Sequence, residues 1–284
     1  MWSLPRPAID ATDTLKACTW RMREQERRAL LLGAAAQLTA AESQYTKAAE
    51  LGTLHSLRNL EDRDKDSQLR DAFLHAYEDG LVASKAGRLL YDLLRAAAPD
   101  ARCPLCGHGE VDTLDHHLPK SIYPLLAIVP LNLVPACSRC NHDKGSDKAT
   151  SPFDQPLHPY FDDLGTDRWL HVTVYPATTT SRGTLKYALR SPATWDATLV
   201  ARAELHFAAF RLAERYSVLA ARATSGIRTM MCRLLAQAGP QAVRAHLVET
   251  ADSYAQAGPN TWETALYYGL AESAWYTGGG MKEL

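Results

Sequence analysis

The hydrophobic positions of the first hundred residues recur at steps of three and four, most regularly over residues 73–94. Alanine, leucine, glutamate and arginine dominate this region, and residues 8–98 contain no proline. Both features favour α-helix. Thr39, followed three residues later by Glu42, also has the spacing of a capping box, which opens a helix. The pattern predicts a helical region over residues 1–100, with one helix beginning after Thr39 and another spanning residues 73–94.

The pattern changes at residue 101. Residues 101–150 are rich in cysteine, histidine and proline, and their apolar positions lack helical spacing as far as Ser138. Beyond a linker rich in proline and aspartate, residues 169–175 alternate between apolar and polar side chains, which is typical of a strand. Residues 184–189 are its expected hairpin partner.

A second helical pattern spans residues 197–237. When residues are placed at 100° intervals, four charged side chains fall within roughly 40° of one another: Glu204, Arg211, Arg215 and Arg222. Apolar residues occupy most of the remaining circumference. This distribution predicts a helix that is buried on most sides and exposes one charged stripe.

Composition and charge narrow the class of protein. The chain has 284 residues, of which 46% are hydrophobic and 22% charged, so it has the composition of a globular protein. Its net charge of −1 excludes a uniformly basic nucleic-acid-binding protein. The average hides a basic block, because residues 181–244 carry ten basic and three acidic groups. Such a block indicates a surface for a polyanion.

The location of the protein also follows from the sequence. No apolar run reaches the roughly 18 residues that span a bilayer, and the first residues lack the basic-then-apolar order of a secretory signal. We therefore expect a cytoplasmic protein without a membrane partner. In that reducing compartment, closely spaced cysteines more often bind metal than form disulfides.

Four of the six cysteines form two Cys-x-x-Cys pairs that are thirty residues apart: Cys103, Cys106, Cys137 and Cys140. Two such turns can present four thiolates to one tetrahedral zinc ion. Zinc binding contributes about 10–16 kcal/mol in small zinc modules, enough to organise a segment with little core. The pairs predict a structural zinc site. Cys18 and Cys232 stand alone and are expected to be ordinary core residues.

Three short motifs lie between and directly after the cysteine pairs. They are Asp115-His116-His117-Leu118-Pro119-Lys120, Asn132-Leu133-Val134-Pro135, and Asn141 followed by Lys144-Gly145. In this order and spacing they resemble the HNH nuclease family with its ββα-metal fold, many members of which carry flanking zinc knuckles. The likeness covers about residues 103–145.

The resemblance implies a role for each motif. His116 would be the general base, Asp115 and Asn141 would hold a catalytic Mg²⁺ or Mn²⁺, and Asn132 would brace the loop that carries the histidine. The chemistry agrees, because a neutral imidazole can take a proton from water and oxygen donors suit a hard divalent ion. Two protein ligands would leave positions for water and phosphate.

A second register remains open, in which His116 is a metal ligand and His117 is the base. The offset of Pro119 favours the first register, and His117 is then expected to pack or to contact DNA. Lys120 and Lys144 are candidate phosphate contacts. The stripe of Arg211, Arg215 and Arg222 could follow a DNA backbone or pair with acidic residues of the N-terminal helices.

The expected fold is mainly α (α+β) in three parts. Residues 1–100 form a helical N-terminal domain, residues 101–150 a zinc-stabilised HNH module, and residues 151–284 an extension with a β-hairpin followed by helices. The expected function is metal-dependent nicking of duplex DNA with little sequence specificity. The alternatives are a non-catalytic zinc module for nucleic-acid binding or assembly, and an RNA-cleaving toxin.

The layout of the chain also resembles the stand-alone HNH nucleases of bacterial anti-phage systems such as Septu and type II Zorya. This likeness implies partner proteins encoded nearby. An almost neutral nuclease gains little attraction to DNA, so we expect restrained activity, with helical regions that partly cover the site. Deleting residues 1–95 should then raise nicking.

Overall fold

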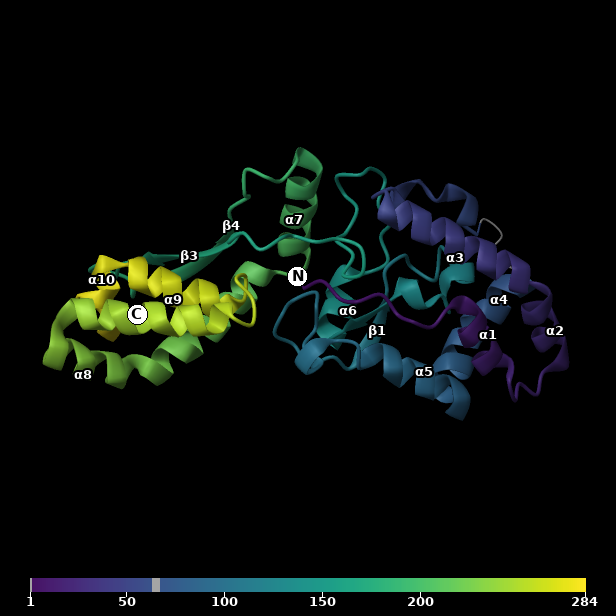
Figure 1. Cartoon of the computed structure of the whole chain (residues 1–284), viewed down its shortest axis with the longest axis horizontal. Coiled ribbons are helices and arrows are strands. Elements are labelled where there is room, and N and C mark those ends of the chain that lie inside the picture. The colour runs from purple at the N-terminus through teal and green to yellow at the C-terminus, as the bar shows by residue number, and fades with distance from the viewer. Residues whose placement is uncertain (1, 63–66) are drawn as a thin grey trace. The chain divides into compact units, whose positions relative to one another are not determined.

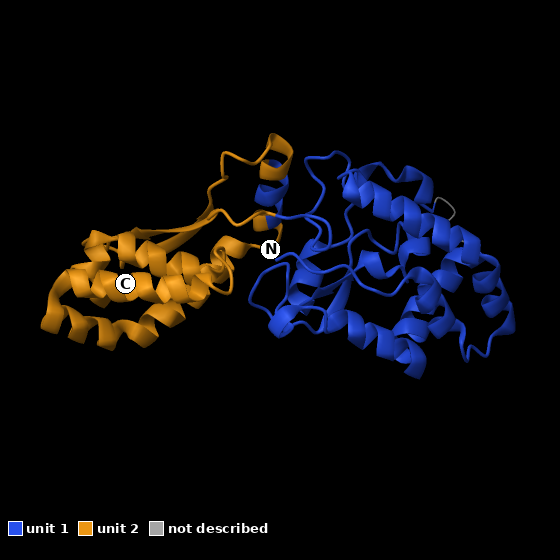
Figure 2. Cartoon of the chain, viewed as in Figure 1, with its two compact units in different colours: residues 1–163, 201–206 blue, residues 164–200, 207–284 orange. Residues whose placement is uncertain are grey.

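The computed structural model describes residues 2–62 and 67–284 (Figure 1). These residues are mostly helical with two small antiparallel sheets, which confirms the expectation of a mainly α chain. They form two compact units, residues 1–163 with 201–206 and residues 164–200 with 207–284 (Figure 2). The first unit therefore contains both the N-terminal helical region and the cysteine-rich segment.

Helices make up most of the first unit. They are α1 (Ala11–Thr19), α2 (Gln25–Gly33), α3 (Ala35–Glu50), α4 (Gln68–His75), the π-helix η3 (Ala76–Ala83), α5 (Lys85–Arg95) and α6 (Ser138–Lys144). Short 3₁₀ turns are η1 (Leu54–Ser56), η2 (Arg58–Leu60), η4 (Pro99–Ala101), η5 (Pro124–Leu126) and η6 (Pro130–Asn132). Strands β1 (Thr113–His116) and β2 (Leu133–Ala136) form an antiparallel pair.

The predicted helix start at Thr39 is wrong. Thr39 lies inside α3, where its hydroxyl donates a hydrogen bond to the carbonyl of Ala35. The carboxylate of Glu42 accepts a hydrogen bond from the backbone amide of Ala11 at the start of α1, at 3.0 Å. The Thr-x-x-Glu spacing therefore serves a contact between two helices rather than a cap.

The helix predicted over residues 73–94 is interrupted. α4 continues into η3, whose wider turns end at Ser84. Ser84 has an extended backbone, and its hydroxyl accepts a hydrogen bond from the amide of Gly87 to begin α5. The apolar spacing does not reveal this break, because Phe73 of α4 and Leu81 of η3 are both buried in the core.

One hydrophobic core joins the N-terminal helices to the segment that precedes β2. Tyr45 and Phe73 from the helices are fully buried in the same cluster as Leu126 and Ile128. The cysteine-rich segment is therefore packed against the helical region and shares its core. This shared burial makes the position of β1 and β2 depend on the helices.

The second unit combines a hairpin with long helices. Its elements are β3 (Leu170–Tyr175), β4 (Thr184–Leu189), α8 (Leu212–Ala255), α9 (Trp262–Glu272), α10 (Ala274–Thr277) and η7 (Gly280–Lys282), and α7 (Ala197–Ala209) contributes residues 201–206 to the first unit. The predicted hairpin is confirmed, with Leu170 opposite Leu189 and Tyr175 opposite Thr184. Within the described ranges, no helix has the length and apolar character to cross a bilayer.

The predicted arginine stripe is wrong, because the helical pattern over residues 197–237 is two helices. Arg211 lies between α7 and α8 with φ 50°, a left-handed backbone that interrupts the helical winding. Its side chain pairs with Glu214. Arg215 is buried, with 7% of its surface exposed, whereas Arg211 and Arg222 are exposed. These arginines cannot form one DNA-binding stripe.

Candidate active site

The four paired cysteines come together in the first unit, although thirty residues separate the pairs. Their Sγ atoms all lie within 4.8 Å of one another, and all four residues are buried. The Sγ atoms of Cys106 and Cys137 are 3.9 Å apart. Zinc–sulfur bonds of about 2.3 Å at tetrahedral angles place sulfurs about 3.8 Å apart. The cluster can therefore hold a metal ion such as a structural zinc.

Local backbone geometry builds the cluster. Gly107 has φ +70°, which glycine adopts without strain, and its amide donates to the carbonyl of Cys103 at 2.7 Å. The amide of Gly109 donates to the sulfur of Cys106, and a Cβ on Gly109 would lie 2.8 Å from the sulfur of Cys137. Because Cys137 directly precedes α6, a metal in the cluster ties this helix to the loop before β1.

Helix α6 carries Asn141 and Lys144 next to β1. The ammonium group of Lys144 donates to the carbonyl of His116 at 2.6 Å and lies 3.1 Å from Oδ2 of Asp115. Asn141 is three residues earlier on α6, so its side chain projects from nearly the same face as Lys144. Within the described residues, the amide side chain of Asn141 makes no hydrogen bond. It is therefore available to a ligand.

His116, at the end of β1, has a defined proton arrangement. Its Nε2 atom lies 2.9 Å from the carbonyl oxygen of Ala127, which can only accept a hydrogen bond. Nε2 therefore carries the proton, and the lone pair is on Nδ1. Burial lowers the pKa of His116 to about 3, although the hydrogen bond to Ala127 opposes this shift. The imidazole is neutral at pH 7 and can accept a proton at Nδ1.

Asp115 is a buried carboxylate with a cationic neighbour. Only 4% of its surface is exposed. Burial raises the pKa of Asp115, and the nearby ammonium of Lys144 opposes that change. A buried carboxylate is stable only when a cation or hydrogen-bond donors compensate it. Lys144 is thus directed at Asp115, and a phosphate contact of Lys144 stays a prediction.

Asn132 holds the loop that follows His116. It is fully buried, and its Oδ1 accepts a hydrogen bond from the amide of Leu118 at 2.7 Å. Its Nδ2 donates to the carbonyls of Leu118 and Leu126, and its own carbonyl accepts from the amide of His117. One amide side chain therefore makes three hydrogen bonds to the backbone of residues 118 and 126.

His117 lies in the interior. Its exposed fraction is 4%, and its ring centroid lies 4.0 Å from that of His158. Burial and the charge of His158 hold the pKa of His117 well below its ordinary value. A contact of His117 with DNA is therefore wrong, and the register in which His117 is the base loses support because the ring does not face solvent. Sequence reasoning missed the neighbour His158, whose Nε2 lies 2.8 Å from the hydroxyl of Tyr45.

The π-helix η3 covers the outer side of this site. The ring of Tyr77 packs edge-on against the imidazole of His116, with centroids 4.4 Å apart. Glu78 accepts a hydrogen bond from the ammonium of Lys120 at 2.8 Å, and this bond lowers the pKa of Glu78. Lys120, the other predicted phosphate contact, is thus paired with η3. Sequence reasoning missed Tyr77 and Glu78, because apolar spacing does not reveal a π-helix.

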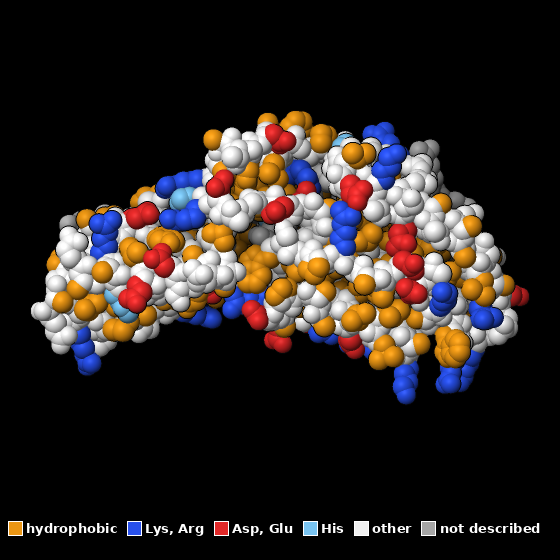
Figure 3. All heavy atoms as spheres, viewed as in Figure 1, with side chains coloured by type: hydrophobic (Ala, Val, Ile, Leu, Met, Phe, Trp, Pro, Cys, Tyr) orange, Lys and Arg blue, Asp and Glu red, His pale blue; other side chains and the backbone are white. Residues whose placement is uncertain are grey.

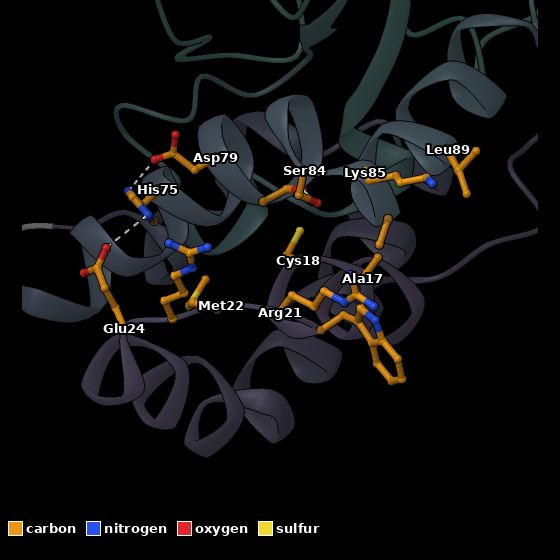
Figure 4. A pocket seen from close by; sticks show the side chains of 14 residues that line it. Ala17, Cys18, Arg21, Met22, Glu24, His75, Asp79, Ser84, Lys85 and Leu89 are labelled. Atoms are coloured by element: carbon orange, nitrogen blue, oxygen red, sulfur yellow. Dashed lines mark hydrogen bonds and ion pairs between the residues drawn. The ribbon is translucent and has the colours of Figure 1, made fainter.

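A pocket of about 470 Å³ lies on another side of η3, between α1, the segment that precedes α2, and α5 (Figure 4). Its lining includes Cys18, Met22 and Lys85, and His75 lies 2.6 Å from the carboxylate of Asp79. Burial raises the pKa of Cys18 to about 12, so its thiol is not a reactive thiolate. None of the residues predicted as catalytic or metal-binding lines this pocket.

Comparison with known proteins gives one similarity. Protein ea31 of Escherichia phage lambda is 28% identical over 212 residues, which cover 69% of this chain and 70% of that protein. No protein-family model matches the chain, and no solved structure matches it.

Proposed function

We propose that the chain is a metal-dependent endonuclease of the HNH type, which hydrolyses phosphodiester bonds and nicks duplex DNA. The observation that carries this proposal is the state of His116, a neutral imidazole whose Nδ1 makes no hydrogen bond within the described residues and which directly follows the buried carboxylate of Asp115 on β1. The cysteine cluster supports it by holding α6, with Asn141, next to the same strand.

His116 acts as general base in this proposal. Nδ1 takes a proton from the attacking water, while Nε2 keeps its hydrogen bond to the carbonyl of Ala127. That bond fixes the ring and stabilises the imidazolium once it forms. Asn132 keeps the following loop in place, so the ring presents Nδ1 in one direction. An approaching phosphate raises the pKa of the imidazole through its negative charge, which favours proton transfer.

Asp115 and Asn141 fit a hard divalent ion. In the described part of the chain, Asp115 is a buried carboxylate with Lys144 as its cationic neighbour, and the side-chain amide of Asn141 makes no hydrogen bond. A bound Mg²⁺ or Mn²⁺ would supply charge stabilisation to the phosphate and the leaving oxygen. In the structure, the ammonium group of Lys144 compensates the charge of Asp115. A divalent ion would have to compete with this ammonium group for the carboxylate.

A second candidate function is a non-catalytic zinc module that serves binding or assembly. The ion pair between Lys144 and Asp115 favours it, because Asp115 is already satisfied without a divalent ion. This candidate shares the cysteine cluster but predicts no turnover and no use of His116.

We also propose that the nuclease is an effector of a bacterial anti-phage system, with partner proteins that release its activity. The contacts of Tyr77 with His116 and of Glu78 with Lys120 support restraint, because they cover the base and a nearby cation. The similar protein ea31 belongs to Escherichia phage lambda. Plaque counts with and without the intact operon, compared with a His116→Ala operon, test this role.

Supercoiled plasmid incubated with Mg²⁺ or Mn²⁺ tests the chemistry. We expect wild type to produce nicked circles, the His116→Ala variant to lose at least about a hundredfold in rate, and His142→Ala to stay near wild type. His142 is an exposed histidine on α6 and so is a matched control. Equal nicking by the His116 variant would remove the base assignment. Cleavage of labelled RNA but not of plasmid would show that the substrate is RNA. Cleavage of neither would favour the non-catalytic zinc module.

A further inference from the structure

Basic residues mark the β3–β4 hairpin of the second unit, whose own sequence contains no acidic residue. Residues 168–195 contain no aspartate or glutamate but include four cations, Arg168, Arg182, Lys186 and Arg190. The segment therefore carries a charge of +4 in a chain whose net charge is −1. Arg182, Lys186 and Arg190 are exposed, and within the described residues none of the three forms an ion pair.

The hairpin has one packed face and one open face. On the packed face, Val172 lies against Gly269 of α9, and the hydroxyl of Tyr187 donates to the carbonyl of Trp262. Side chains alternate along a strand, so the other face carries a different set. It consists of His171, Thr173 and Tyr175 from β3 and of Thr184, Lys186 and Ala188 from β4. Figure 3 shows Lys, Arg and His side chains close together over the region of β3 and β4, with Asp and Glu side chains beside them.

The loop between β3 and β4 adds hydroxyl groups to this surface. The hydroxyl of Thr178 accepts hydrogen bonds from the amides of Thr180 and Ser181, so the loop has a defined turn. Residues 178–182 are all exposed. Hydroxyls, backbone amides and guanidinium groups are the donors that most often contact DNA phosphates.

Positive charge dominates around the open face. Burial lowers the pKa of His171, the charges of Arg190 and Arg168 lower it further, and only Glu272 and a hydrogen bond to the carbonyl of Arg168 oppose them. Tyr175 adds an exposed aromatic ring at the far end of β3, with 47% of its surface accessible. The face thus combines cations, hydroxyls and one aromatic ring, without a carboxylate of its own.

We infer that the open face of the β3–β4 hairpin is a second DNA-contact surface, which holds the phosphate backbone of duplex DNA. This inference rests on the proposed nuclease function and adds to it a binding surface outside the unit that carries His116. A strand of six residues is about 20 Å long, and a two-stranded ribbon fits the major groove, which is about 12 Å wide. Arg182 and Lys186 contact phosphates, so the binding is independent of base sequence.

The test is binding of a short fluorescent DNA duplex to the full chain in EDTA, where no cleavage occurs. The variant replaces the three exposed cations of the hairpin, Arg182→Gln, Lys186→Gln and Arg190→Gln. The matched control replaces three exposed arginines of α8, Arg222→Gln, Arg233→Gln and Arg244→Gln, with the same change of charge. All six side chains are exposed, so both variants should keep the wild-type melting temperature.

We expect the hairpin variant to bind about tenfold or more weakly, with a slope of log affinity against log salt that is smaller by about 2 to 3. The α8 control should change much less. Equal losses in the two variants, or no loss in the hairpin variant, would overturn the inference, as would a loss confined to duplex RNA. Nicking is measured separately, so an inactive chain with hairpin-dependent DNA binding would contradict the nuclease proposal alone.

Discussion

The ring of Tyr77 packs edge-on against the imidazole of His116, with 4.4 Å between the ring centroids. The two residues are 39 positions apart in sequence and lie in the π-helix η3 and at the end of β1. This contact places a helix of the N-terminal region directly on the proposed general base. Restraint of the proposed nuclease can therefore be tested by single substitutions in η3.

Weakening the contact that holds η3 over His116 should raise the rate of plasmid nicking. Glu78→Gln removes the carboxylate that pairs with Lys120, while the glutamine keeps the size of the side chain. The pair is largely exposed, so stability should change by less than about 1 kcal/mol. We expect plasmid nicking to rise several-fold because η3 is held less firmly over His116. Glu50→Gln, which removes an exposed pair with Arg6 in the same unit, is the control and should leave nicking unchanged.

The hydrophobic core that the N-terminal helices share with the site changes how a truncation is interpreted. Tyr45 and Phe73 share one core with Leu126 and Ile128, so deleting residues 1–95 would expose the apolar side of the site. The higher nicking expected from the sequence for this deletion is therefore a poor test of restraint. We expect the truncated chain to be insoluble or unfolded, as seen by circular dichroism, whereas a soluble and folded fragment would contradict the shared core.

The cysteine cluster should hold about one zinc per chain. Cys140→Ser removes one of the four ligands, so we expect loss of the metal and a large fall in melting temperature. Cys232→Ser, outside the cluster, should retain the zinc. Metal analysis by mass spectrometry checks both variants. A brief EDTA treatment should stop nicking and leave the zinc bound, and full zinc content in the Cys140 variant would contradict a four-cysteine site.

Acid should destabilise the first unit. Burial lowers the pKa of His158 and of His206 to about 3, while unfolded histidine has a pKa of about 6.5. Between these values the unfolded chain binds more protons, so the free energy of unfolding is highest above pH 6.5 and falls as pH decreases below it. The slope is on the order of 1 kcal/mol per pH unit for each histidine.

Urea unfolding at several pH values measures this slope. His206→Gln can keep the hydrogen bond to the carbonyl of Leu105 and cannot take up a proton. We therefore expect a shallower fall in stability between pH 6.5 and 4.5 for this variant than for wild type. Parallel curves for the two proteins would show that His206 is not a buried neutral histidine.

Removing the bracing amide should damage both stability and activity. Asn132→Ala deletes three side-chain hydrogen bonds and leaves the amide of Leu118 and the carbonyl of Leu126 without this partner. We expect a loss of about 2–4 kcal/mol in the free energy of unfolding. Asn59→Ala, an exposed asparagine that bonds to Gln44, should cost less than about 0.5 kcal/mol. Similar losses in the two variants would show that Asn132 does not brace the loop.

Features that depend on local chemistry could be predicted from the sequence. The alternation over β3 and the partner segment Thr184–Leu189 follow from a period of two residues. The two Cys-x-x-Cys pairs converge as predicted, because each pair is a tight turn and the ligands are fixed by residue type. Of the motif residues, Asp115 lies on β1, and Asn132 accepts a hydrogen bond from the loop that follows β1.

Features that depend on a single backbone angle or on tertiary packing could not be predicted. One left-handed residue, Arg211, separates α7 from α8 and destroys the arginine stripe, although the apolar period continues across it. His117 looks like a polar surface residue in sequence, but it lies beside His158 in the interior. Lys144 likewise faces inward, because α6 brings it to Asp115.

The winding of η3 has a consequence for how this chain can change. A π-helix contains more residues per turn than an α-helix, and removing one residue from Ala76–Ala83 would let the segment wind as an ordinary α-helix. The wider turns absorb the extra residue, so the elements on either side would keep nearly the same orientation after such a deletion. The tyrosine beside His116 and the glutamate beside Lys120 would then stand on a narrower helix. A chain shortened by one residue here should therefore keep its core and change its contacts at the histidine.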